Sequence, residues 1–126
     1  MKAFSIPTAL LLAILGFSLW VGYHVDQRTE HWVFLLEQVG ETAAGENWSE
    51  AGARLEEAYA DWDANQQFFH TILEHDELDE AESLFAGARA VCAQQDDGEF
   101  HVLLAELIEQ LRLLAETQST GVKNIL

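Results

Sequence analysis

Histidine and acidic side chains gather in one short stretch of the chain, residues 70–80. His70 and Glu74 are four residues apart, and so are His75 and Asp79. Residues at that spacing share one face of a helix, so each pair could hold a metal ion between an imidazole and a carboxylate. The stretch therefore supplies the candidate metal ligands of this sequence, which are His70, Glu74, His75 and Asp79.

Two other interpretations of residues 70–80 stay open beside a metal site. A catalytic zinc site normally has three protein ligands and one open position, and the HExxH motif is absent from the sequence. His75 and Asp76 could instead brace a turn in a way that depends on pH, because imidazole titrates near neutrality. The simplest alternative is structural, with the acidic side chains forming a solvated helix face.

The sequence gives little support for other catalytic residues. Adjacent carboxylates such as Glu56 with Glu57 could act as an acid and a base, but 22 acidic residues in a small chain make such pairs by accident. No nucleophile motif and no glycine-rich phosphate loop is present. The single Cys92 excludes an internal disulfide and is expected to be a small buried residue, with an intermolecular disulfide as the alternative. We predict that the protein is not an enzyme and holds no cofactor.

The charge distribution divides the chain into two parts. The 126 residues include 22 Asp and Glu against 6 Lys and Arg, for a net charge of −16. Residues 3–25 contain none of these, whereas all of the acidic residues lie in 26–126. Nucleic-acid binding needs clusters of Lys and Arg, and there are none. We therefore expect a neutral apolar segment joined to an acidic domain, with no nucleic-acid partner.

The neutral segment is long enough to cross a membrane. As a helix, residues 3–25 would span about 35 Å, against about 30 Å for the hydrocarbon core of a bilayer. A cleaved signal peptide and a buried core helix are the alternatives. Signal cleavage requires small residues after the apolar run, and here bulky Leu19, Trp20 and Tyr23 stand in that place. We predict a transmembrane anchor over residues 1–25, in contact with membrane lipid.

The flanks of this segment predict its orientation in the cytoplasmic membrane. Lys2 precedes the segment and the acidic residues 26–126 follow it. The positive-inside rule then places the N-terminus inside and the acidic domain outside, in a single-pass arrangement. Trp20, Tyr23 and His24 are amphipathic rings of the kind that settle at the depth of the lipid headgroups.

Helical periodicity continues through residues 26–126, with no alternating β pattern of useful length. The first helix should continue beyond the bilayer to Gly45, and Asn47 with Glu50 has the spacing of a capping box that begins a second helix at Trp48. A break is expected near Asp63, followed by a helix to about residue 93 in which Asp76 could cap a second part. A last helix should begin after a loop at 94–98, where Asp96 and Glu99 repeat the capping spacing. The predicted fold is all-α: an N-terminal transmembrane helix and a small antiparallel helical bundle.

A partner surface is predicted just beyond the membrane. Trp32, Leu35, Leu36 and Val39 continue the apolar stripe of the first helix. If the bundle is built mainly from residues 48–116, this stripe is not covered, and an uncovered aromatic stripe is typical of a protein interface. Trp48 and Trp62, by contrast, are expected to pack in the core. 

Several segments resemble a known family. The anchor, GENWSEAGARLEEAYADW at 45–62, HTILEHDELDEAESL at 70–84, DGEF at 97–100 and KNIL at 123–126 are similar to family 4363 of the domains of unknown function, from Gram-positive bacteria. The resemblance covers nearly the whole chain, and it implies a small membrane-anchored helical protein with no assigned activity. We therefore expect a non-enzymatic extracytoplasmic interaction module that binds a protein partner or a second copy of itself. The alternative is a metal-binding or cation- or pH-sensing domain that uses residues 70–80.

Overall fold

The computed structural model describes residues 2–73 and 75–125, with side chains described for residues 5–71, 73 and 75–117. Within these residues the secondary structure is entirely helical. The helices are α1 (Lys2–Ala44), α2 (Trp48–Ala64), α3 (Gln66–Ile72), α4 (His75–Gln94) and α5 (Asp97–Ile125). Glu74 and the side chains of the KNIL end lie outside the described residues.

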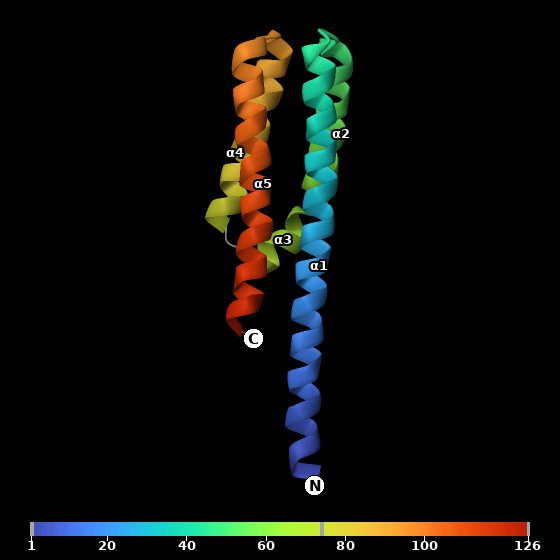
Figure 1. The fold of residues 1–126 in the computed structure, drawn as a ribbon, viewed down its shortest axis with the longest axis vertical. Helices are drawn as coiled ribbons and strands as arrows, with labels where there is room; N and C mark the ends of the chain where they lie inside the picture. Colours follow the sequence, from blue (N-terminus) through green and yellow to red (C-terminus); the bar gives the residue numbers. More distant parts are fainter. Residues whose placement is uncertain (1, 74, 126) are drawn as a thin grey trace.

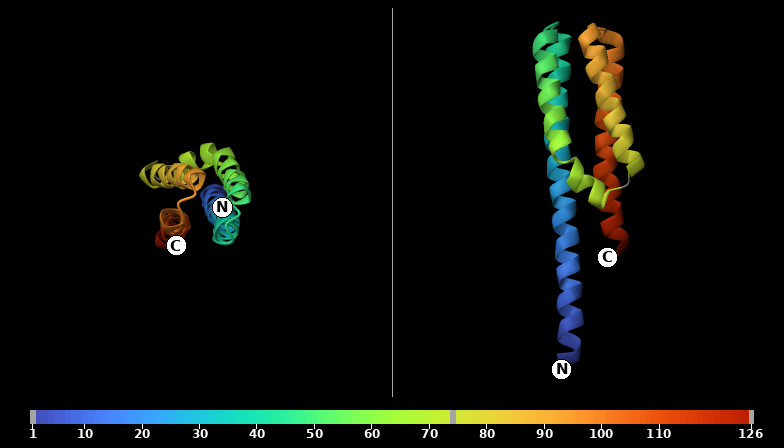
Figure 2. Two further views of the ribbon diagram at one scale, coloured as in Figure 1. Left: turned by 90° about the horizontal axis from the view of Figure 1, so that it is seen from above. Right: turned by 180° about the vertical axis from the view of Figure 1, so that it is seen from behind.

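Four of these helices form an antiparallel bundle. α1 and α2 make one hairpin, α4 and α5 make another, and the short α3 crosses between the two hairpins (Figure 1). Each hairpin turns at the same end of the molecule, and the end-on view in Figure 2 shows the helices around a common axis. α1 packs against α2 and α5, while α4 packs against α5 and α2. The predicted all-α fold with an antiparallel bundle is confirmed.

Local capping sets the start of two helices, as the sequence predicted. The backbone N–H of Glu50 donates to Asn47 Oδ1 at 3.3 Å, and Asn47 Nδ2 donates to a carboxylate oxygen of Glu50 at 2.9 Å. The backbone N–H of Glu99 donates to Asp96 Oδ1 at 3.2 Å. These bonds satisfy N–H groups that the first turn of a helix leaves without partners. The left-handed residue after α1 is Glu46, with φ of 65°, rather than Gly45.

The second half of α1 is a full member of the bundle. Its buried apolar side chains lie on one face of the helix, with the buried Thr29 between the second and the third of them, and are Val21, Val25, Trp32, Val33, Leu36, Val39 and Ala43. The expectation that residues 48–116 mainly build the bundle is therefore wrong, because α1 supplies one of the four walls of the core. Helix α1 is also continuous through residue 25, the end of the predicted anchor, so that the apolar segment and the bundle share one helix.

The predicted partner stripe is covered by the rest of the chain. Trp32 is 1% exposed, Leu36 and Val39 are fully buried, and Leu35 is half-buried against the core. The prediction of an open stripe at 32–39 is wrong, because α2 returns antiparallel along α1 and α5 covers the adjoining side. A stripe that follows the apolar segment directly in sequence still lies inside the bundle, since α2 and α5 run back along α1 (Figure 1).

An aromatic cluster fills the core where α1, α2, α3 and α4 meet. The ring of Trp32 meets Trp62 edge-on at 5.1 Å between centroids, and Phe69 at 5.4 Å. Trp62 also contacts Phe85 at 5.5 Å. Trp62 is a core residue, as expected, whereas Trp48 is only half-buried and packs edge-on against Phe100.

The chain breaks twice between α2 and α4. The expected break near Asp63 is present as a turn at Asn65. A second break follows Ile72, where Leu73 is extended with φ of −115° and ψ of 163°, so that the predicted helix toward residue 93 is two helices. Asp76 lies in the first turn of α4, which begins at His75, and so does not precede the helix as a cap. This second break lets α3 cross from one hairpin to the other.

Candidate functional site

The first half of α1 projects beyond the bundle (Figure 1). Large apolar side chains on it are more than half exposed, namely Ile6, Leu10, Leu11, Leu12, Ile14, Phe17 and Leu19. The most apolar 18-residue window of the helix is only 6% buried. By length and composition α1 could cross a membrane or act as a signal sequence, and the low burial disagrees with the alternative of a soluble core helix.

Aromatic rings join this projecting segment to α3. The rings of Trp20 and His24 stack with centroids 5.3 Å apart, and Phe68 of α3 meets them edge-on at 6.0 and 5.1 Å. Trp20 is 52% exposed, whereas Val21 beside it is buried. The change from exposed to buried apolar side chains on α1 therefore occurs at residues 20–21, with α3 beside it.

The break between α3 and α4 brings two histidines together. His70 lies in the last turn of α3 and His75 is the first residue of α4. Their Nδ1 atoms are 2.9 Å apart, and their rings stack with centroids 5.0 Å apart. This pair joins residues five apart across the break, and it differs from the four-residue pairs that the sequence suggested.

The other predicted metal ligands divide between described and undescribed residues. Asp79 shares a face of α4 with His75 at the helical spacing and is exposed. Glu74 lies outside the described residues, and α3 ends before it, so the continuous helix assumed for His70 and Glu74 is not there. Among the described side chains, no three His, Cys, Asp or Glu residues are grouped as a metal site.

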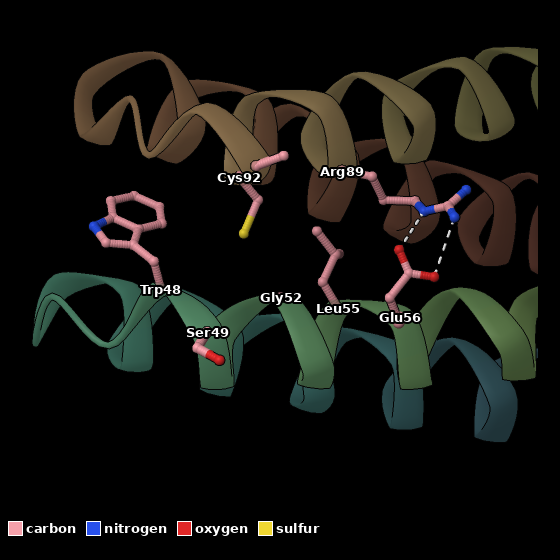
Figure 3. Close-up of a pocket in the computed structure, with 8 residues that line it drawn as sticks. Trp48, Ser49, Gly52, Leu55, Glu56, Arg89 and Cys92 are labelled. Atoms are coloured by element: carbon pink, nitrogen blue, oxygen red, sulfur yellow. Dashed lines mark hydrogen bonds and ion pairs between the residues drawn. The ribbon is translucent and has the colours of Figure 1, made fainter.

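A groove of about 280 Å³ lies between α2 and α4 at the end of the bundle where the hairpins turn. In Figure 3, Cys92 points from α4 toward Gly52 of α2, with Trp48 on one side and Arg89 on the other. A Cβ on Gly52 would lie 3.9 Å from Cys92 Sγ. Burial, and then the nearby Glu56, raise the pKa of the Cys92 thiol, which favours the neutral form. The expected small buried cysteine is confirmed at 5% exposure.

A hydrogen-bond network links α2 to α4 on the same side of the bundle, farther along α2 than the groove. Glu82 of α4 accepts a hydrogen bond from the Tyr59 hydroxyl at 2.6 Å and another from Trp62 Nε1 at 2.8 Å. Arg89 lies over the Tyr59 ring at 4.3 Å and donates to Glu56 at 2.6 Å. The hydrogen bond to Glu82, followed by burial, raises the pKa of Tyr59. These hydrogen bonds, together with the ion pair between Arg89 and Glu56, connect α2 to α4.

The four arginines of the bundle are all engaged in ion pairs. The pairs are Arg28 with Asp61, Arg54 with Glu50, Arg89 with Glu56, and Arg112 with Glu37 and Glu109. Three of the arginines bridge two helices, and each such exposed pair stabilises the fold by at most about 1 kcal/mol. Of the acidic side chains that the structure describes, those outside these pairs have no arginine partner.

A second groove, of about 450 Å³, lies between α4 and α5. Its apolar lining is Leu84, Ala105 and Leu113, and Glu80, Glu106 and Glu109 stand around them. Leu113 is 45% exposed, although the adjacent Leu114 is buried in the core. Sequence reasoning missed this groove. Its signal is the pair of adjacent leucines at 113–114, of which only one can face the core of a helical bundle.

These features define a class of protein: an acidic four-helix bundle whose first helix extends beyond it as an apolar segment, with one groove between α2 and α4 and another between α4 and α5. The chain belongs to the DUF4363 family, a domain of unknown function, whose family model matches residues 19–125. The match begins where α1 enters the bundle and includes α2 to α5. No curated protein and no solved structure matches the chain.

Proposed function

We propose that this protein is a single-pass membrane protein whose acidic bundle stands on the outer face of the cytoplasmic membrane as a non-enzymatic interaction module. The observation that carries the proposal is the continuity of α1, which is apolar and exposed over residues 5–20 and buried in the bundle from Val21 onward. Apolar side chains that the protein leaves uncovered over this length are suited to lipid. A rigid helix would then fix the bundle close to the bilayer.

Retention of the apolar segment is supported by the packing at residues 20–25. Val21 is 3% exposed and Val25 is 1% exposed, so both belong to the core. Cleavage after Val25 would remove these two side chains and the ring contacts between His24 and Phe68. A retained anchor is therefore the form in which the bundle is complete.

The groove between α4 and α5 is the surface that we assign to a partner. We take its occupant to be a basic amphipathic helix of another protein. Apolar residues of such a helix would cover Leu84 and Leu113, and its Lys or Arg side chains would face Glu80 and Glu106. Charge complementarity favours this occupant over a second copy, because two chains of net charge −16 repel each other.

Membrane fractionation and intact mass test the anchor. The full-length protein should stay with membranes after an alkaline carbonate wash and retain residues 1–25. Leu11→Glu with Leu12→Glu should release a folded bundle, because neither side chain is covered by it, whereas Phe34→Glu, at an exposed site on the bundle, should leave the protein in the membrane. A wild-type chain that is washed off, or that begins after Val25, would refute the anchor.

Peptide binding tests the groove with a defined probe, a synthetic amphipathic helix of Leu and Lys. Leu113→Glu should weaken its binding by about tenfold, because a buried interface leucine is replaced by a charge. The control is Phe34→Glu, which adds the same charge on α1, at a side chain that is 57% exposed. If the overall negative charge of the bundle alone held the basic helix, both variants would bind it at least as well as the wild type does. That result would refute the assignment of the groove as the binding site.

A further inference from the structure

The two histidines at the corner between α3 and α4 bring two imidazole nitrogen atoms within hydrogen-bond distance of each other. His70 Nδ1 and His75 Nδ1 are 2.9 Å apart. With metal–imidazole bonds of about 2.0 to 2.1 Å, that separation subtends an angle of about 90° at a shared ion. Tetrahedral coordination would instead need the two nitrogen atoms about 3.4 Å apart. The separation is that of an N–H···N hydrogen bond, and it is also close to the spacing of two adjacent ligands of a square or octahedral metal.

We propose that His70 and His75 form a two-imidazole site for a divalent transition metal of tetragonal preference, of which copper(II) is the strongest binder. Copper(II) and nickel(II) take square or tetragonal arrangements of nitrogen and oxygen ligands, and copper(II) binds most tightly in the Irving–Williams order. The other positions would be filled by water, since His75 is exposed. This site is separate from both grooves and does not depend on the proposed membrane anchor or partner.

Packing on both sides holds the two rings in place. Phe69, next to His70, is fully buried against Trp32, which fixes the last turns of α3. Leu78 is 1% exposed and fixes the first turn of α4 below His75. A preformed pair of ligands binds more tightly than the same ligands on a mobile loop, because less conformational freedom is lost on binding.

The hydrogen bond between the two rings shows which proton must move when a metal binds. In the metal-free chain, one ring donates its Nδ1 hydrogen to the Nδ1 atom of the other ring across the 2.9 Å contact. To bind the metal through both Nδ1 atoms, the donor ring moves its proton to Nε2, so a neutral pair releases no net proton.

Copper(II) titration of the full-length protein, purified in detergent without a histidine tag, tests this site. Electron paramagnetic resonance should show one copper ion per chain coordinated by two imidazole nitrogens. His70→Ala should lower the affinity by at least about tenfold, because the loss of supporting groups outside the ligand shell already costs that much. His75→Phe keeps a stacked ring but has no ligand atom, and it should weaken binding equally.

The matched control is His101→Ala. His101 Nε2 lies 3.1 Å from Asp97 on α5, at the helical spacing that the sequence suggested for metal binding, but no second histidine is paired with it. This variant should bind copper as the wild type does. Unchanged affinity in His70→Ala and in a folded His75→Phe would overturn the proposal. So would a signal from one imidazole only, or an equal loss in His101→Ala.

Discussion

Replacing Trp32 by alanine should destabilise the bundle strongly. The indole is 1% exposed, packs edge-on against Trp62 and Phe69, and donates from Nε1 to Asp61 at 2.5 Å. Removal of a buried tryptophan costs about 3 to 5 kcal/mol, because it loses the burial free energy and leaves a cavity. For a bundle of this size, that loss should lower the thermal midpoint by about 12 °C or more.

The measurement is thermal unfolding followed by far-ultraviolet circular dichroism of the full chain in detergent. The thermal midpoint of Trp32→Phe should lie between those of the wild type and Trp32→Ala. This variant keeps an aromatic ring but loses the hydrogen bond to Asp61, which is worth about 1 kcal/mol. Phe34→Ala is the matched control, since Phe34 is two residues away on the same helix and 57% exposed, and it should change the midpoint little. If Trp32→Ala and Phe34→Ala had equally small effects, the assignment of residues 32–39 to the core would be refuted.

Two further predictions concern helix contacts and pH. Gly87→Ala should raise the thermal midpoint, because alanine has a higher helix propensity and the new Cβ would meet Leu103 at an ordinary contact distance of 3.7 Å. Gly40→Ala should raise the midpoint less, or lower it, because its Cβ would lie only 3.1 Å from Leu104. The pKa of Tyr59 is raised by its hydrogen bond to Glu82 and by burial. The folded state therefore holds this proton more tightly, so the contribution of Tyr59 to stability is fully present below the ordinary tyrosine pKa of 10.0 and is lost as the pH rises above it. Tyr59→Phe should show a smaller fall in stability than the wild type in alkaline unfolding curves.

Short-range features of this chain could be read from the sequence. A capping box involves residues only three apart, so Asn47 and Asp96 identified the starts of α2 and α5 without knowledge of the rest of the fold. Helical periodicity likewise identified an all-α chain, since the apolar face repeats within each helix. The apolar character of the first part of α1 follows from composition, because residues 3–25 contain no Asp, Glu, Lys or Arg.

The partners of each apolar face depended on tertiary structure. Periodicity shows that the stripe containing Trp32 is apolar, but not that α2 and α5 cover it. The groove at Leu113 arises for the converse reason: helix α5 has more apolar residues than its two neighbours can cover. Whether an apolar face is buried or left open is set by how many helices surround it, and that number is a property of the whole bundle.

The candidate metal pair shows the same division at the level of two side chains. The sequence identified the stretch at residues 70–80, where histidines and acidic residues are concentrated. It paired residues four apart, because that is the spacing of one continuous helix. The tertiary structure instead joins His70 and His75, since the extended backbone at Leu73 ends α3 and turns the chain into α4. Composition thus determined which residues could do chemistry here, and the crossing of α3 between the two hairpins decided which of them meet.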